Sequence, residues 1–372
     1  MIYKDFQELK LSALGMGTMR LPTLDNDPDK IDEEKTYDMV KYALENGVNY
    51  FDTAYMYHGG NSELVMGRVL NKFPRDSFYL ADKFPGFYKE VFLDVKGTFE
   101  KQLEKCNVDY FDFYLFHNVT EKNVDDYMNE EYGLLNYCLE QKRNGRIKHL
   151  GFSAHGELPV LRKFLEKYGK YMEFCQLQIN YLDWTFQEAK EKVDLMNEYN
   201  IPVWVMEPVR GGTLASLPEE HTNRLKELRP NESVVAWAFR FLQSIPSVTM
   251  ILSGMSNEEQ LKQNIETFKT DDVLNENEMQ TILDIAQKMT KGIPCTECRY
   301  CTTRCPLGLD IPYILKCENE RQFTGRVAWG LNSLDDEKKP SACLGCKACE
   351  AVCPQEIKIA TLMKEIANTL KK

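Results

Sequence analysis

This sequence of 372 residues has no excess of basic residues, no long apolar runs and few cysteines in its first 294 positions. Lys and Arg number 46 against 57 Asp and Glu, and the net charge of −11 argues against nucleic acid or an anionic membrane as a partner. No apolar run approaches the length of a membrane span. Residues 1–6 lack the basic-then-apolar pattern of an export signal. We therefore expect a cytoplasmic protein.

Cysteine is frequent only near the C-terminal end of the sequence. Only three of the twelve cysteines precede residue 295, and the other nine lie between Cys295 and Cys353. A secreted disulfide scaffold would need an export signal, so a metal centre is the better interpretation. The length and composition fit one large domain plus a small module. We predict a large domain over residues 1–290 and a cysteine-rich domain over residues 291–372.

Short apolar segments alternate with amphipathic ones through the first three quarters of the chain. Eight strands are predicted, over residues 13–21, 49–52, 78–82, 111–116, 147–152, 174–179, 202–206 and 248–252. Helices are predicted between and after them, over residues 33–46, 62–72, 91–106, near 132–143, 157–168, 187–199 and 257–268, and more than one helix is predicted within residues 214–244. Strands at this spacing with helical crossovers indicate a parallel sheet. Eight such units favour a closed (β/α)₈ TIM barrel, with an open doubly wound sheet as the alternative.

A complete dinucleotide fingerprint is also missing. Residues 15–18, Gly-Met-Gly-Thr, supply half of it, but the third glycine is absent and no helix follows directly. A Rossmann site is therefore rejected. In a barrel, the chemistry is instead expected where each strand ends. The predicted strand ends carry Asp52, Lys83, His117, Ser153, Gln178, Met206 and Ser253.

Tyr57 follows the strand that ends at Asp52, and it is the predicted proton donor. An ordinary tyrosine has a pKa of about 10, too high for good acid catalysis near neutrality. A neighbouring cation lowers that pKa, and Lys83 is expected to supply it. Asp52 is expected to hold Lys83, and His117 to hydrogen-bond a substrate oxygen. The alternative is a set of ordinary rim residues.

Over roughly residues 10–270, this pattern resembles the aldo/keto reductase family. The resemblance rests on Tyr57, Lys83 and His117 and on five segments, residues 17–18, 51–54, 151–153, 178–181 and 254–264. It implies a catalytic tetrad of Asp52, Tyr57, Lys83 and His117. It also implies that a nicotinamide nucleotide binds across the barrel mouth. Hydride would then pass to a carbonyl carbon while Tyr57 protonates the oxygen.

The resemblance implies a set of nucleotide contacts: Thr18, Asp52, Ser153, Gln178, Met206, Val209, Arg210, Ser253, Gly254, Ser256, Gln260 and Asn264. Ala154 stands where the family often has Asn, and Met206 stands where an aromatic side chain usually stacks on the nicotinamide. Glu258 and Glu259 replace the basic residues that commonly clamp a 2′-phosphate, which favours NADH over NADPH. Arg210 is expected either to contact a phosphate or to form a loop salt bridge.

The late cysteines form two copies of one motif, Cys-x2-Cys-x2-Cys-x3-Cys-Pro, at residues 295–306 and 343–354. This is the [4Fe–4S] spacing of bacterial ferredoxins, whereas zinc would need only paired Cys-x2-Cys units. Each copy precedes a short amphipathic segment expected to be helical. Because the fourth cysteine ligates the other cluster in two-cluster ferredoxins, we predict crossed ligation. One cluster uses Cys295, Cys298, Cys301 and Cys353, and the other uses Cys343, Cys346, Cys349 and Cys305. Cys317 falls outside the spacing and is expected to be a packed thiol.

The sequence therefore predicts an oxidoreductase that interconverts a small carbonyl compound and its alcohol with NADH or NADPH. Hydride transfer moves two electrons and each cluster moves one, so the two parts do not combine directly. FMN would bridge them but has no signature in the sequence. Three hypotheses stay open. The clusters exchange electrons with the barrel or with an electron-transfer protein, they only hold the tail together, or the chain is an electron carrier on a barrel scaffold.

Overall fold

The computed structural model describes residues 1–25, 27–290, 292–293, 295, 299, 301–327, 329–353 and 355–370. The chain separates into two compact units, Met1–Met279 and Gln280–Lys372. Helix α13 (Glu276–Met289) runs across that boundary. The domain boundary between residues 290 and 291 stays a prediction. Among the described residues, no helix combines the length and the apolar character that crossing a membrane requires.

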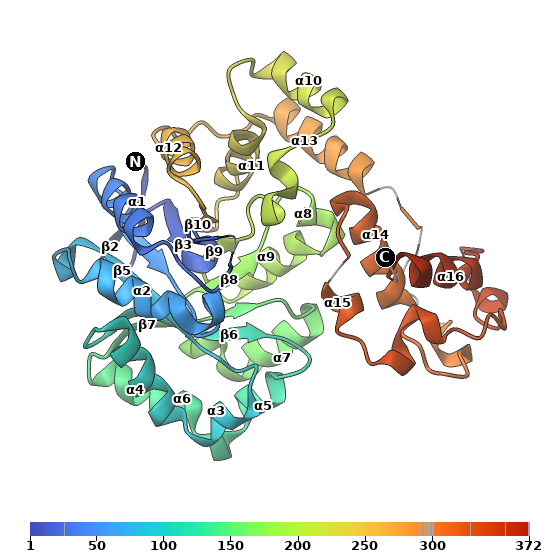
Figure 1. Ribbon diagram of the computed structural model, residues 1–372, viewed down its shortest axis with the longest axis horizontal. Coiled ribbons are helices and arrows are strands. Elements are labelled where there is room, and N and C mark those ends of the chain that lie inside the picture. Colours follow the sequence, from blue (N-terminus) through green and yellow to red (C-terminus); the bar gives the residue numbers. More distant parts are fainter. Residues whose placement is uncertain are drawn as a thin grey trace. The chain divides into compact units, whose positions relative to one another are not determined.

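Eight parallel strands close into a barrel in the first unit (Figure 1). In order around the barrel they are β3 (Leu14–Gly17), β4 (Tyr50–Asp52), β5 (Tyr79–Phe84), β6 (Phe111–Val119), β7 (Ile147–Ala154), β8 (Cys175–Gln178), β9 (Val203–Met206) and β10 (Val248–Gly254). The last strand pairs with the first, with Ile251 opposite Leu14. The closed barrel is confirmed, and the open sheet is excluded.

Helices surround this barrel (Figure 1). They are α1 (Glu33–Glu45), α2 (Asn61–Leu70), α3 (Lys89–Leu93), α4 (Val95–Cys106), α5 (Val124–Met128), α6 (Leu134–Arg143), α7 (Leu158–Tyr168), α8 (Asp183–Phe186), α9 (Ala189–Glu198), α10 (Glu219–Leu228), α11 (Val234–Gln243) and α12 (Glu258–Thr267). The single helix predicted over residues 91–106 is wrong, because Asp94 breaks it. The Asp94 carboxylate accepts a hydrogen bond from Gly97 N at 2.8 Å and so begins a new helix. The first strand is also shorter than predicted, because Thr18–Arg20 turn into a 3-10 helix.

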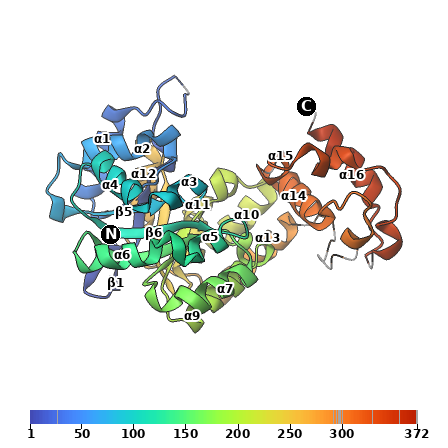
Figure 2. The same ribbon diagram turned by 90° about the horizontal axis from the view of Figure 1, so that it is seen from below.

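An antiparallel hairpin, β1 (Tyr3–Phe6) and β2 (Leu9–Ser12), precedes the barrel and is marked by the label β1 in Figure 2. Phe6 from this hairpin packs against Phe113, Phe174 and Trp204, which point into the barrel. The barrel interior is therefore filled by large apolar side chains and forms a core, as is usual for this fold. The polar side chains are left to the ends of the strands.

The second unit contains helices α14 (Ile311–Thr324), α15 (Trp329–Asn332) and α16 (Ile359–Thr369) (Figure 2), with short 3-10 turns before α14 and between α15 and α16. The sequence repeat holds in its backbone. The turns Thr302–Arg304 and Glu350–Val352 occupy equivalent places, and α14 and α16 begin at equivalent residues. Arg299 and Lys347, also equivalent, both have a φ of 63°. The amphipathic segment after each motif is helical, as predicted.

Candidate active site

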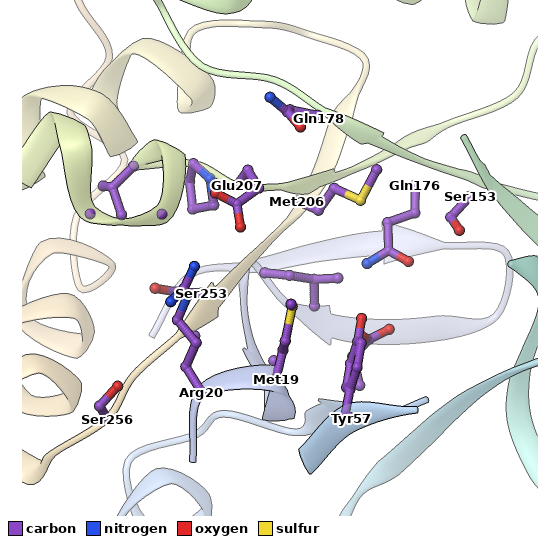
Figure 3. Close-up of a pocket in the computed structure, with 18 of the residues that line it drawn as sticks. Met19, Arg20, Tyr57, Ser153, Gln176, Gln178, Met206, Glu207, Ser253 and Ser256 are labelled. Carbon is purple, nitrogen blue, oxygen red and sulfur yellow. The ribbon is translucent and has the colours of Figure 1, made fainter. Parts of the chain in front are cut away.

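The ends of the barrel strands converge on one cavity of about 580 Å³ (Figure 3). Tyr57 lines it. So do all seven strand-end residues predicted from the sequence: Asp52, Lys83, His117, Ser153, Gln178, Met206 and Ser253. Parallel strands in a closed barrel present their carboxyl ends at one rim, which brings side chains far apart in the sequence together. The structure thus places the four tetrad residues in one site.

Lys83 lies at the centre of the tetrad. Its Nζ donates hydrogen bonds to Asp52 Oδ1 at 2.6 Å and to the Thr53 carbonyl at 2.7 Å, and it lies 3.5 Å from Tyr57 Oη. The side chain is 1% exposed. Burial lowers the pKa of Lys83, but the Asp52 carboxylate and the Tyr57 phenol outweigh that effect and raise it. Lys83 is therefore an ammonium held by Asp52 against the phenol, as predicted.

The expected pKa of Tyr57 is not what the structure gives. Burial raises the pKa of Tyr57, and the Lys83 ammonium opposes that rise without cancelling it. The prediction of a lowered pKa considered only the cation and ignored the desolvation of a phenol that is half-buried at the cavity. Tyr57 begins a tight turn in which His58 has a φ of 53°. His58 Nε2 accepts a hydrogen bond from Leu21 N at 3.2 Å, which ties this turn to the segment after β3.

His117 is a neutral imidazole. The ring is 8% exposed, and burial together with the nearby Lys83 charge holds the pKa of His117 well below its usual range. Its Nδ1 has no hydrogen-bond partner among the described residues. The ring packs edge-to-face on Tyr57, with centroids 6.2 Å apart. Tyr127 Oη donates to the His117 carbonyl at 2.7 Å and thereby fixes this strand end.

Two of the predicted nucleotide contacts do not line the cavity, whereas the rest do. Thr18 is fully buried behind the tetrad, where its Oγ1 donates to the Asp52 carbonyl at 2.9 Å. Arg210 is buried in an ion pair, with its Nε bonded to both Asp183 carboxylate oxygens at 3.0 and 3.1 Å. The salt-bridge alternative for Arg210 is therefore the one that the structure contains.

Several residues that line the cavity were not predicted from the sequence, among them Met19, Arg20, Gln176 and Glu207 (Figure 3). Gln176 lies two residues before Gln178 on β8, so strand alternation would have found it. Arg20 and Glu207 follow strands β3 and β9 in irregular segments, where no periodicity applies. A Cβ added at Gly211 would lie 3.2 Å from Arg20 Nη2 and 3.6 Å from Glu207 Oε2, so both side chains reach one part of the cavity.

The described cysteines line two further cavities in the second unit. One is lined by Cys305, Cys343, Cys346 and Cys349, and the other by Cys295, Cys301 and Cys353. Each cavity combines thiols from both motifs, as crossed ligation requires; Cys298 lies outside the described residues. No disulfide joins the described cysteines. Within the described chain, no three Cys, His, Asp or Glu side chains meet closely enough to hold a single metal ion.

Cys317 lines neither cysteine cavity. It lies on α14, is 5% exposed and belongs to the apolar core of the second unit. Burial raises the pKa of the Cys317 thiol to about 12. Its surroundings are those of a packed thiol.

Two family models match the chain in adjoining parts. The model of the aldo/keto reductase family matches residues 13–287, and that of a 4Fe-4S dicluster domain matches residues 277–358. Among curated proteins, the chain is 26% identical over 290 residues to an uncharacterised oxidoreductase of Bacillus subtilis, covering 70% of this chain and 88% of that protein. It is 24% identical over 304 residues to the NADH-specific methylglyoxal reductase of Escherichia coli, covering 69% and 90%.

Solved structures give the same fold. An aldo-keto reductase from Bacillus halodurans in its holo form superposes with a TM-score of 0.63 at 25% identity, covering 77% of this chain and 96% of that one. An aldo-keto reductase from Klebsiella pneumoniae in complex with NADPH superposes with a TM-score of 0.61 at 17% identity, with the same coverage of 77% and 96%. The second likeness shows the fold alone. The barrel thus has relatives both in sequence and in structure.

Proposed function

Because this chain belongs to the aldo/keto reductase family, we propose that its barrel reduces an aldehyde or ketone, or oxidises the alcohol, with Tyr57 as the proton donor. The chain is an NAD(P)H-dependent oxidoreductase with a C-terminal ferredoxin-type iron–sulfur domain. The observation that carries the proposal is the tetrad itself, with Lys83 Nζ between Asp52 Oδ1 and Tyr57 Oη at 2.6 and 3.5 Å.

The cavity residues suit a nicotinamide nucleotide. Amide and hydroxyl groups of Ser153, Gln178 and Asn264 line the cavity, and the Nδ1 of His117 beside them is buried without a partner among the described residues. Met206 offers an apolar wall in place of an aromatic one. When bound, the nicotinamide supplies or accepts the hydride.

The tetrad then handles the proton. Tyr57 Oη donates a proton to the carbonyl oxygen in reduction and takes it back in oxidation. The Lys83 ammonium stabilises the phenolate that Tyr57 leaves, and Asp52 keeps Lys83 charged and in place. The neutral His117 imidazole is suited to orient the oxygen by a hydrogen bond without competing for the proton.

We propose that NADH is preferred to NADPH, but not because Glu258 and Glu259 repel a 2′-phosphate. Glu258 pairs with Lys262 at 2.6 Å, Glu259 accepts from Gln263 at 3.1 Å, and neither lines the cavity. The support lies instead in the scarcity of cations among the described lining residues. These include Lys83, which is engaged by Asp52, and one arginine, Arg20. One guanidinium suits the diphosphate bridge and leaves none for a 2′-phosphate.

For the second unit, we propose two [4Fe–4S] clusters with crossed ligation that pass electrons to or from a protein partner. The two cysteine cavities support this ligand set, because each is lined by thiols of both motifs. When bound, each cluster supplies transfer of one electron. Anaerobic iron and sulfide counts of about eight each would support the proposal, and about four each would limit it to one cluster.

The test of the barrel proposal is Tyr57→Phe, assayed anaerobically with NADH and a panel of aldehydes and ketones. Turnover is expected to fall by about 10²–10⁴-fold, since the variant loses the proton donor and keeps the ring. Tyr55→Phe is the matched control, because Tyr55 lies two residues earlier and does not line the cavity. Unchanged turnover in Tyr57→Phe would overturn the assignment.

A further inference from the structure

Directly behind Lys83 lies a buried cluster that the tetrad does not include. Glu63 on α2, Asp82 on β5 and Gln102 on α4 are each fully buried. Gln102 Nε2 donates to Glu63 Oε1 at 3.2 Å and to Asp82 Oδ2 at 3.1 Å, so one amide joins the two carboxyl groups. Tyr114 Oη donates to Gln102 Oε1 at 2.6 Å, and the Lys83 carbonyl, which can only accept, requires the amide nitrogen on the side of the acids.

The cluster also holds the backbone of Lys83. Strand β4 ends at Asp52, opposite Ala81, so β5 runs on to Lys83 without a β4 partner. Lys83 N donates to Asp82 Oδ1 at 2.8 Å, and Gln102 Nε2 also reaches the Lys83 carbonyl at 2.9 Å. Side chains thus supply the hydrogen bonds that a longer β4 would otherwise offer. The position of Lys83 depends on this cluster as well as on Asp52.

The charges around the cluster do not balance two carboxylates. Lys105 from α4 forms an ion pair with Glu63. The other nearby cation, Lys83, directs its Nζ to Asp52 and the Thr53 carbonyl. The remaining groups facing Asp82 are neutral donors: Gln102, Tyr114 behind it, and Cys106, whose Sγ lies 3.9 Å from Asp82 Oδ2. One cation for two buried acids leaves a charge that a proton must neutralise.

We propose that Glu63 and Asp82 share one proton and, as a singly charged pair, act as positioning residues for Lys83. The proton stays on the Asp82 side, since Glu63 has Lys105 as its counter-ion. Burial and the Glu63 charge raise the pKa of Asp82 well above its usual range, in agreement with this assignment. A hydrogen bond between the two carboxyl groups can form only while one of them carries the proton.

This arrangement affects the tetrad through charge. An ionised Asp82 would stand next in sequence to Lys83 and would raise the pKa of both Lys83 and Tyr57. A protonated Asp82 keeps its backbone hydrogen bond to Lys83 while adding no charge there. The catalytic part of this inference rests on the proposed carbonyl chemistry, whereas the shared proton does not.

The first experiment detects the proton without substrate or nicotinamide. A protonated carboxyl group gives an infrared carbonyl band that a carboxylate lacks. The wild-type protein is expected to show this band near neutral pH. Asp82→Asn is expected to remove it, because Glu63 keeps Lys105 as its counter-ion. Glu63→Gln is expected to remove it as well, because Asp82 then faces no second carboxylate and Lys105 loses its partner. Asp112→Asn is the control, since Asp112 is already paired with Arg75 at 2.6 Å, and that variant should keep the band.

The second experiment compares pH profiles of turnover. Asp82→Asn leaves the charge on Glu63, and its basic limb is expected to match that of the wild type. Glu63→Gln moves the charge to Asp82, which is closer to the tetrad. The apparent pKa of its basic limb is therefore expected to shift to higher pH by about 0.5 pH unit or more. A merely structural role would lower turnover in both variants without separating their limbs.

A wild-type spectrum without the band, or a band that survives in both variants, would overturn the shared proton. Coinciding basic limbs in the two variants would overturn the positioning role. A protein that reduces no carbonyl compound but shows the expected spectra would contradict only the proposed function. The two failures are therefore distinguishable.

Discussion

The barrel and the cysteine-rich unit hold their functional groups by different means. In the barrel, Lys83 is bound by Asp52 and the Thr53 carbonyl and is fully buried. In the second unit, the thiols line two cavities, and two predicted ligands, Cys301 and Cys349, belong to its apolar core. The first site is organised by hydrogen bonds within the protein. The second is organised around groups that the protein must acquire.

The two units therefore differ in whether their folding depends on the groups that carry their function. A barrel core of large apolar side chains holds the strands whether or not a ligand is bound. A small unit with few apolar residues usually needs a metal or disulfide staple. In the second unit, the clusters would occupy part of the core, so electron transfer and folding would depend on the same thiols. The following predictions test that contrast.

The largest expected effect is on the second unit. In Cys349→Ser, about half of the iron should be lost, and amide exchange over residues 301–370 should become fast. The barrel strands should keep their protection, because their core contains no predicted ligand. Cys317→Ser is the control and should retain all the iron. Iron-depleted protein with a fully protected second unit would show that the contrast is false.

Next in size is the loss of the tetrad cation. In Lys83→Met, turnover per folded barrel should fall by about a hundredfold or more, since Tyr57 loses the charge that stabilises its phenolate. The melting temperature should also fall, because Asp52 is left buried and unpaired at a cost of about 3 kcal/mol. Lys89→Met, at an exposed lysine after the same strand, should change neither quantity. Wild-type turnover would contradict the prediction.

A smaller effect is expected for nucleotide affinity. Arg20 lines the cavity and forms no hydrogen bond or ion pair with another part of the described chain. In Arg20→Met, the dissociation constant for NADH, measured by calorimetry, should rise about tenfold, as for a lost charged hydrogen bond. Arg68→Met removes a guanidinium that pairs with Glu33 at 2.7 Å outside the cavity, and it should bind normally. Equal affinity in all three proteins would remove Arg20 from the site.

The smallest effect concerns a carboxylate in the barrel frame. Burial raises the pKa of Glu173, but hydrogen bonds from His149, Leu150 N and Lys142 outweigh it and lower the pKa to about 2. Glu173→Gln should therefore cost about 2 kcal/mol of unfolding free energy near neutral pH.

A carboxyl group whose pKa is lower in the folded than in the unfolded protein stabilises the fold above its unfolded pKa, which for Glu173 is the ordinary value of 4.5. That stabilisation is lost as the pH falls toward 2. The difference between Glu173→Gln and the wild type should narrow over that window in urea titrations. Glu166→Gln, at an exposed carboxylate, should match the wild type throughout. A gap that stays constant with pH would mean that Glu173 acts by packing alone.

The side chains at the strand ends could be predicted from the sequence, because the alternation of side chains along a strand and the spacing of strands are local properties. Asp52, Lys83 and His117 could be read from the ends of apolar segments, and all three line the cavity. Arg20 and Glu207 could not be read this way, since they lie in irregular segments whose course depends on tertiary packing. The pKa of Tyr57 was misjudged for a related reason, because burial is not visible in a sequence.

Two features were determined by the sequence alone: the order of eight strands with their chemical ends, and the duplicated cysteine motif. Both repeat at fixed intervals, and local periodicity needs no knowledge of distant contacts. Only the tertiary structure decided that Arg210 pairs with Asp183 and that Gln102 joins Glu63 to Asp82 behind Lys83. Those contacts join residues 20 to 39 positions apart in the chain, and the packing of neighbouring strands, loops and helices brings them together.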